Sequence, residues 1–283
     1  MFTFCHLIVQ YADSNEKIGN NDNESNRIVV LKNYILFSNL IYLDETDSTN
    51  SYIRRQINAD SPNMHSGCVV CAREQTNGRG RKDRVWISGK DTGLTFSFIL
   101  DLKGKQPAEI VTITLAAGVG VSAALRELGI ECKLKWPNDI YVGDKKLCGI
   151  LSETVGSGEN LYAICGVGIN VNLDNMALES IGAPATSIYV QTAVSYSCSQ
   201  ILPIVLKNLD IMLAEWFACG IEIIAQQWMG NAYGLGRAVQ AVEGGKIIDE
   251  GFFVGLGSKG QFLLRRFDGT IKEIWAADII WCK

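Results

Sequence analysis

The sequence predicts a mixed α/β (α+β) fold, in which helices pack on a mixed sheet and a small β-barrel follows at the carboxyl end. Strand-like and helix-like segments alternate from residue 40 to about residue 230, and after Gly234 only short strand-like segments separated by glycine-containing turns remain. Hydrophobic residues make up 47% of the 283 residues and charged residues 20%. This balance predicts a large buried core and excludes global disorder.

Hydrophobic periodicity and turn signals place the elements of the larger part. Strands are predicted at 40–44, 67–74, 94–100, 132–136, 146–155 and 161–172, with residues 137–145 connecting two of them. Helices are predicted at 47–59, 108–129, 199–218 and 221–229. Asp47 or Ser48 is expected to cap the first of these helices, because a short polar side chain there can accept from the free amides.

Changes in composition and hydrophobic pattern along the chain predict three parts: an N-terminal extension at 1–39, a larger domain at 40–232 and a small β domain at 233–283. Residues 13–26 of the extension are polar and rich in asparagine, so that part is expected to be disordered. The extension is too short for a helix-turn-helix domain with its linker. Together with the net charge of −4, this argues against a DNA-binding protein.

Cysteine usage predicts a reduced, cytoplasmic protein. The nine cysteines are odd in number, and most lie in apolar runs, where a free thiol packs as a small hydrophobe. Cys68 and Cys71 should face opposite sides of their strand, which excludes shared redox or metal chemistry. With only two histidines no bound metal is expected, and neither an export signal nor a membrane span is visible.

A glycine- and arginine-rich segment, Arg73–Trp86, is the most informative stretch. Its five positive and two negative side chains give it a net charge of +3 in a chain of net charge −4. Glycines let the backbone approach a ligand closely, and arginines offer planar donor pairs to a phosphate or carboxylate. A small anionic ligand is favoured. A solvated basic turn and a nucleic-acid-binding loop are the alternatives, the second with few aromatic partners.

Two further segments carry chemistry. Lys135–Asp139 (KWPND) delivers Asn138 and Asp139 at a strand end, and Lys146 then opens an apolar strand, where its charge needs solvent or an anion. The stretch Cys165–Asn172 puts two glycines inside a strand, which is typical of close approach by a ligand. The structural alternatives are a plain hairpin for the first segment and a β-bulge for the second.

Taken together, five ordered motifs resemble the biotin protein ligases. They are STN (Ser48–Asn50), GRGRKDRVW (Gly78–Trp86), KWPND, KLCGIL (Lys146–Leu151) and GVGIN (Gly166–Asn170). The resemblance covers about residues 40–172. It implies a catalytic domain like those of class II aminoacyl-tRNA synthetases and an SH3-like barrel at the carboxyl end.

The resemblance also implies an activity, that of a ligase forming a C–N bond (EC 6.3.4.15). The biotin carboxylate attacks the α-phosphate of ATP with Mg²⁺ assistance, and the resulting biotinyl-AMP then acylates a lysine on a biotin carboxyl carrier protein or domain. No membrane or DNA partner is implied, and whether the chain forms a homodimer is left open. Fixed cations suit this chemistry, because two anions must be brought together where water is excluded.

Site residues follow from the same resemblance, position by position. Catalysis is assigned to Arg79, Arg81, Lys146 and Asp139, with Asp139 orienting or deprotonating the incoming lysine. Biotin binding is assigned to Ser48, Thr49, Asn50, Gln75, Arg79, Gly80, Arg81, Lys146, Gly166 and Gly168. ATP or AMP binding is assigned to Arg81, Arg84, Trp86, Asn138 and Lys146, with Trp86 stacking on adenine.

One departure from the family pattern and two rival functions remain. Family members often have glycine where this chain has Asp83, and a carboxylate there is expected to pair with Arg81 or Arg84 and slow loop closure. Lipoate or octanoate ligases share the fold, but their basic loop is of a different kind. A catalytically inactive binding module is the other rival, and the complete set of Arg79, Arg81, Asp139 and Lys146 argues against it.

Overall fold

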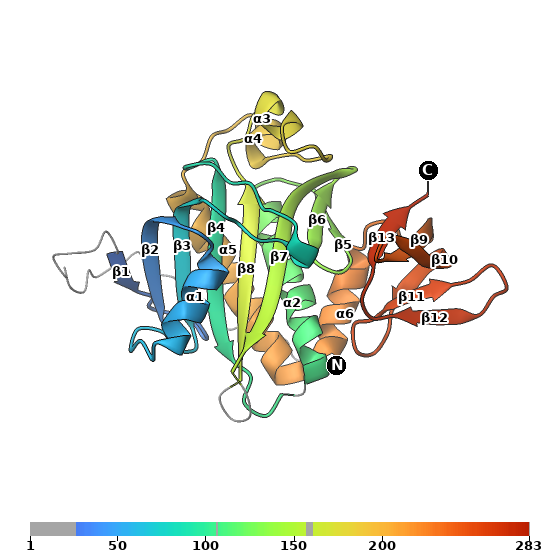
Figure 1. Cartoon of the computed structure of the whole chain (residues 1–283), viewed down its shortest axis with the longest axis horizontal. Coiled ribbons are helices and arrows are strands. Elements are labelled where there is room, and N and C mark those ends of the chain that lie inside the picture. Colours follow the sequence, from blue (N-terminus) through green and yellow to red (C-terminus); the bar gives the residue numbers. More distant parts are fainter. Residues whose placement is uncertain (1–26, 106, 157–160, 283) are drawn as a thin grey trace, which may run out of the picture.

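The computed structural model describes residues 27–105, 107–156 and 161–282. The segment 13–26, predicted to be disordered, lies outside the described residues. Within those residues, eight strands form a large sheet in the order β1-β2-β3-β4-β8-β7-β6-β5 (Figure 1). The strands are β1 Arg27–Val30, β2 Asn39–Thr46, β3 Cys68–Gln75, β4 Gly93–Asp101, β5 Lys133–Lys135, β6 Asp139–Val142, β7 Lys145–Val155 and β8 Tyr162–Asn170.

The large sheet is mixed, as the sequence predicts. β2 and β3 pair in parallel, with α1 (Thr49–Asn58) as the crossover between them. All other neighbouring strands pair antiparallel. The central strand β4 is buried along nearly its whole length, which is why its sequence is almost continuously apolar.

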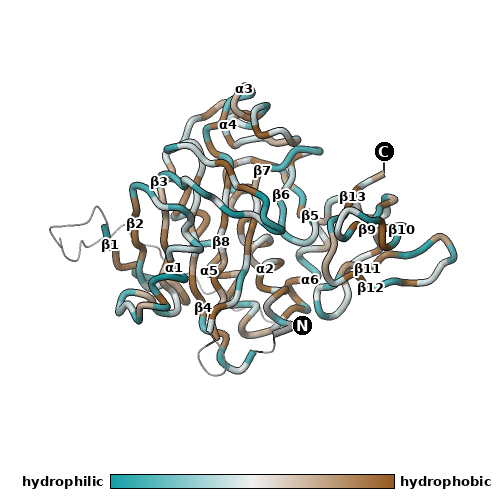
Figure 2. Tube along the Cα trace, viewed as in Figure 1, coloured by the Kyte–Doolittle hydropathy of each residue, from teal (hydrophilic) through white to brown (hydrophobic). Residues whose placement is uncertain are grey.

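Helices cover both faces of this sheet (Figure 1). α1 packs on one face, where its Ile53 joins a cluster with Ile41 and Val70. The long helices cover the other face around a larger core; they are α2 Pro107–Glu127, α5 Cys198–Cys219 and α6 Ile221–Gly230. Figure 2 shows the apolar sheet and helices in brown at the centre of the molecule. Cys68 belongs to the first cluster and Cys71 to the second, so the expectation that they face opposite sides is confirmed.

A second, antiparallel sheet follows α6, with the order β12-β11-β10-β9-β13. Its strands are β9 Ala238–Glu243, β10 Lys246–Leu256, β11 Phe262–Arg265, β12 Ile271–Ile274 and β13 Asp278–Trp281. It packs beside β5 through Trp136, whose ring lies 5.5 Å from that of Phe262 and whose indole N–H donates to the Gly260 carbonyl at 3.0 Å. The two sheets therefore share one continuous core.

Four elements differ from the sequence-based expectation. Residues 137–145, expected as a plain connection, contain the strand β6, because Asp139–Val142 pairs with both of its neighbours. The short helices α3 (Asn175–Glu179) and α4 (Ile188–Thr192) carry no periodicity and rely on capping by the side chains of Asp174 and Ser187. β1 lies inside the predicted extension, yet it pairs with β2 as an edge strand.

No helix in the described ranges is both long enough and apolar enough to cross a membrane.

Candidate active site

One cavity of about 580 Å³ lies over the large sheet and is closed on one side by the second sheet. Every residue that the sequence analysis assigned to catalysis or binding lines it. These residues are Ser48, Thr49, Asn50, Gln75, Arg79, Gly80, Arg81, Arg84, Trp86, Asn138, Asp139, Lys146, Gly166 and Gly168. They come from six segments of the chain, so the fold unites motifs up to 120 residues apart.

At one end of the cavity, neutral side chains form a buried hydrogen-bond network. Gln75 Oε1, at the end of β3, accepts from the Thr49 amide at 2.8 Å and satisfies a free donor of the first turn of α1. Thr49 Oγ1 lies 2.6 Å from Ser97 Oγ, and Ser97 Oγ donates to Asn50 Oδ1 at 2.6 Å. Because these groups satisfy one another, the pocket is rigid before any ligand arrives.

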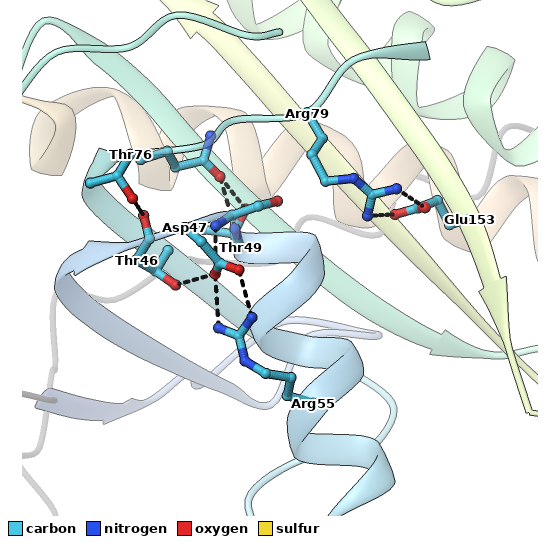
Figure 3. A network of polar contacts seen from close by, with 9 residues as sticks. Thr46, Asp47, Thr49, Arg55, Thr76, Arg79 and Glu153 are labelled. Carbon is cyan, nitrogen blue, oxygen red and sulfur yellow. Dashed lines mark hydrogen bonds and ion pairs between the residues drawn. The ribbon is translucent and has the colours of Figure 1, made fainter. Parts of the chain in front are cut away.

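The start of α1 is held in place by Asp47 (Figure 3). Its carboxylate accepts from the Ser48 amide at 2.8 Å and from both terminal nitrogens of Arg55 at 2.6 and 2.8 Å. These hydrogen bonds, those from Arg55 above all, lower the pKa of Asp47 to about 2. Ser48 occupies the N-cap position without a capping bond of its own. The expected side-chain cap is therefore not formed: of the backbone amides here, Asp47 accepts only from that of Ser48, and Gln75 satisfies the Thr49 amide in its place.

The glycine-rich loop folds back on itself above the cavity. The Gly80 amide donates to the Arg84 carbonyl at 2.7 Å, and the Trp86 amide donates to the Gly78 carbonyl at 2.9 Å. At the tip, Lys82 and Asp83 have φ angles of 54° and 58°, in the left-handed region. Aspartate tolerates this conformation at some cost, whereas glycine adopts it freely.

Two glycines of β8 make room for neighbouring side chains. A Cβ at Gly168 would lie 2.4 Å from the Trp86 indole, and one at Gly166 would lie 2.4 Å from Asn50 Oδ1. Trp86 therefore rests on the strand, and its buried indole N–H has no hydrogen-bond partner within the described part of the chain. That donor is available to a ligand, since a buried N–H without a partner is costly.

The other end of the cavity is charged. Lys146 Nζ lies 2.7 Å from Asp139 Oδ1, so the predicted lysine and carboxylate form an ion pair. The same ammonium group is 5.6 Å from the centre of the Trp86 ring. Asn138 accepts from Arg81 at 3.3 Å and donates to the Ile150 carbonyl at 2.8 Å, which fixes its amide orientation.

Asp278, from the second sheet, completes this charged end. Its Oδ2 lies 2.7 Å from an Arg84 guanidinium nitrogen and 3.2 Å from Lys82 Nζ. Burial raises the pKa of Asp278, but the hydrogen bonds from Lys82 and Arg84 outweigh burial and lower it overall. Arg84 thus pairs with Asp278 and not with Asp83, contrary to expectation, because the fold brings the second sheet against this loop.

Lys135 also lines the charged end, and its ammonium lies 3.1 Å from the Tyr141 hydroxyl. Burial lowers the pKa of Lys135 and outweighs the opposing effect of Asp139. Burial likewise lowers the pKa of Arg81, against the opposing effects of Asp278 and Asp139. Both shifts have one meaning: these cations are poorly solvated and would gain from an anion in the cavity.

Sequence reasoning missed four residues around the cavity. Lys135 lies inside the quoted KWPND motif, so its charge next to a strand end was a usable signal. Ser97 lies in an apolar strand, where a single serine ordinarily indicates no functional role. Glu153 and Asp278 had no local signal, because their partners lie 74 and about 195 residues away.

The described residues contain no cluster of three or more histidine, cysteine, aspartate or glutamate side chains suited to a metal ion. Burial raises the pKa of the Cys68 and Cys165 thiols to about 12, so neither is a thiolate near neutral pH.

Comparison with known proteins agrees with the geometry. Residues 42–170 match the model of the biotin/lipoate A/B protein ligase family. The chain is 31% identical to the bifunctional ligase/repressor BirA of Bacillus subtilis over 257 residues, covering 88% of this chain and 76% of that protein. It is also 31% identical to the biotin–[acetyl-CoA-carboxylase] ligase of Paracoccus denitrificans, over 79% of this chain and 92% of the relative.

Among solved structures, the fold is similar to that of the biotin protein ligase from Aquifex aeolicus in complex with biotin and ATP. The TM-score is 0.72 at 34% sequence identity, over 86% of this chain and 98% of the other. Fold and cavity together define an acid-activating ligase. The chain belongs to the biotin/lipoate A/B protein ligase family.

Proposed function

We propose that this chain is a biotin protein ligase that uses ATP to attach biotin to a lysine of a biotin-dependent carboxylase carrier domain. One observation carries the proposal: the predicted biotin and ATP residues line a single cavity with a neutral, hydrogen-bonded end and a cationic end. Biotin has a neutral ring and an anionic tail, and ATP is an anion. The relatives named biotin ligases, and the neighbour bound to biotin and ATP, support the same assignment.

The neutral end suits the ureido ring of biotin. Ser48, Thr49 and Gln75 would bind its carbonyl and N–H groups; Gln75 has an amide nitrogen to donate because its oxygen already accepts from Thr49. Asn50 would act in the same pocket. Gly166 and Gly168 have no side chains, so they would leave room beside β8 for the biotin tail.

The cationic end suits the first half-reaction. A biotin carboxylate oxygen attacks the α-phosphorus of ATP, the bond to the bridging oxygen breaks, and pyrophosphate leaves. Lys146 would bridge the two reacting anions, while Arg79, Gly80 and Arg81 would cover them. Arg84 and Asn138 would hold the nucleotide, with Trp86 against adenine. Preformed cations in a water-poor site stabilise the charge that develops on phosphate.

Asp139 suits the second half-reaction. The acceptor lysine amine attacks the carbonyl carbon of the mixed anhydride, a C–N bond forms, AMP leaves and the amine loses a proton. A carboxylate beside the anhydride would orient the amine and accept that proton. Its ion pair with Lys146 at 2.7 Å would hold it beside the reacting carbonyl.

Mg²⁺ would enter with ATP. The charged end offers Asp139 and Asp278 but no larger acidic cluster among the described residues, which fits an ion held mainly by phosphate oxygens and water. Bound there, Mg²⁺ would neutralise polyphosphate charge. We also propose the division into a catalytic domain at 40–232 and a C-terminal domain at 233–283, since the second sheet begins after α6.

Biotin-dependent exchange of labelled pyrophosphate into ATP tests the proposal, with lipoate and octanoate run in parallel. Exchange with biotin alone is expected. Exchange with lipoate or octanoate instead would assign the chain to the other branch of its family. Folded protein that exchanges with none of these acids in the presence of Mg²⁺ would overturn the proposed ligase activity.

A further inference from the structure

Glu153, on β7, lies just behind the cavity and is not one of its lining residues. Its side chain is only 18% exposed, yet its carboxylate serves three partners. Arg79 donates to both oxygens, at 2.8 and 3.2 Å, and the pair is visible in Figure 3. Asn50 Nδ2 donates at 2.9 Å, and Arg54 of α1 reaches within 3.5 Å. One carboxylate therefore joins α1, β7 and the glycine-rich loop.

The hydrogen bonds leading to Glu153 have a fixed direction. Ser97 has a single hydroxyl hydrogen, which it donates to Asn50 Oδ1, so Thr49 is the donor in its 2.6 Å contact with Ser97, and its contact with Gln75 Oε1 is the longer one at 3.1 Å. Asn50 then donates onward to Glu153. The chain runs from Thr49 through Ser97 and Asn50 to an anion, and an anionic terminus strengthens each bond that points toward it.

The Arg79 contact also fixes the loop. Arg79 and Val85 pair across the folded loop, and the Gly80 and Trp86 amides close the same small hairpin. Segment 78–86 can therefore move only as a unit, so that holding the Arg79 guanidinium also holds Trp86 over the strand glycines. Arg54 and Arg79 both approach Glu153 Oε1, and without the carboxylate their like charges would push the loop outward.

We infer that Glu153 is a positioning residue that couples the ring end of the cavity to closure of the glycine-rich loop. The inference rests on the proposed function, because its ligands are biotin and biotinyl-AMP. Glu153 touches neither the cavity nor a reacting atom. It acts through Asn50 and Arg79: a ligand in the preorganised ring pocket is held by the network that ends on Glu153, and the same carboxylate retains the loop and the intermediate beneath it.

Glu153→Gln is the informative variant, since it keeps the size of the side chain and removes its charge. A glutamine nitrogen cannot accept from Asn50 or Arg79, so one partner is lost. Because hydrogen bonds to charged groups are among the stronger ones, we expect KM for biotin and the release rate of biotinyl-AMP each to rise about tenfold. The value of kcat at saturating biotin is expected to stay within about threefold of wild type.

Glu127→Gln is the matched control. Glu127 also accepts from a cation and an amide, Lys207 and Asn208, but at the end of α2 and far from the cavity. It should leave KM and intermediate release unchanged. In an Arg79→Gln background, Glu153→Gln is expected to add little, because the two residues act through one contact.

Three results would overturn the inference: unchanged release of biotinyl-AMP, an equal fall in kcat with KM unaltered, or effects of Glu153→Gln and Arg79→Gln that multiply. Pyrophosphate exchange by the wild-type protein is measured first. Its absence would refute the proposed function itself, whereas normal wild-type exchange with an unaffected Glu153→Gln variant would refute only the role of Glu153.

Discussion

The two ends of the cavity are built on opposite electrostatic plans. At the ring end, Thr49, Ser97 and Asn50 are buried and satisfy one another through short hydrogen bonds. At the charged end, Lys146 and Arg84 are held by the carboxylates of Asp139 and Asp278, and most of the side chains keep some exposure. The first end is preorganised for a neutral group. The charged end holds cations that are paired with carboxylates of the protein itself.

This difference teaches where each kind of binding energy arises. A neutral network gains little net energy from each bond but loses much when one buried partner is removed. Cations that are already paired in a poorly solvated site can exchange a carboxylate partner for a phosphate, so they are never buried without a counter-ion. Substitutions at the charged end should therefore change rates, and substitutions at the ring end should change biotin affinity and stability.

The largest effect is expected from Lys146→Ala. The variant removes the cation between the two reacting anions, so biotin-dependent pyrophosphate exchange should fall about 100- to 1000-fold. Exchange assays at saturating biotin and ATP measure the loss. Exchange within about threefold of wild type would place the essential cation elsewhere.

Asp139→Ala should separate the two half-reactions. It leaves Lys146 without its partner, which slows adenylation modestly, and it removes the proposed base, which should slow lysine transfer about 100-fold. Single-turnover transfer from synthetic biotinyl-AMP isolates the second step. Transfer at the wild-type rate would show that the incoming amine needs no base at this position.

Asp278→Asn tests whether the second sheet contributes to the charged end. Losing the contacts to Lys82 and Arg84 should loosen that side of the loop and raise KM for ATP about fivefold, while KM for biotin stays unchanged; a partly exposed ion pair supports no larger effect. The control is Asp249→Asn, because Asp249 pairs with Arg266 within the same sheet but outside the cavity. If both variants changed KM for ATP equally, the Asp278 contact would contribute to stability and not to ATP binding.

Ser97→Ala tests the ring end. The change leaves Asn50 Oδ1 without its buried donor and leaves the Thr49 hydroxyl only its 3.1 Å contact with Gln75 Oε1. The free energy of unfolding should therefore fall by about 1–3 kcal/mol, and KM for biotin should rise several-fold. Urea unfolding and steady-state kinetics measure the two quantities. Ser122→Ala, at a buried serine of α2 that bonds only its own helix, should leave KM unchanged. A KM shift of equal size in both variants would speak against a rigid biotin pocket.

The smallest effect concerns Asp47, which holds the start of α1. Its pKa in the folded protein, about 2, lies below the ordinary value of 3.8, so its stabilising effect is complete above about pH 4 and is lost as pH falls toward 2. Because Asp47 and Arg55 are both well exposed, the effect should stay below about 1 kcal/mol. Asp47→Asn should unfold at lower urea than wild type near pH 6 and at the same urea near pH 2. A difference in the urea needed for unfolding that persisted near pH 2 would have a cause other than the ionisation of Asp47.

Elements with strong patterns were predictable from the sequence. The helix predicted at 108–129 is observed at Pro107–Glu127, and strands separated by turns follow Gly234 as predicted, because long apolar periodicities and glycine turns are local signals. The strand β6 was missed because turn-forming residues flank a four-residue segment. Its pairing on both sides is a tertiary effect that no local pattern carries.

The cavity shows the same limit. Its lining could be predicted because ordered motifs, each weak alone, resemble one family. The residues behind the lining could not. Glu153 and Asp278 are ordinary acidic residues in strands, and their roles arise only when the fold brings Arg79 and Arg84 to them. Contacts between residues so far apart in the sequence can be identified only from the structure.

Transfer of biotin to a carrier domain tests the central claim most directly. An apo biotin carboxyl carrier domain is incubated with the wild-type protein, biotin, ATP and Mg²⁺, and its intact mass is followed, with the acceptor lysine changed to arginine as control. The account predicts a mass increase of one biotin on the lysine form and none on the arginine form or without ATP. An unmodified carrier domain, despite active pyrophosphate exchange with biotin, would contradict the claim that this cavity completes both half-reactions.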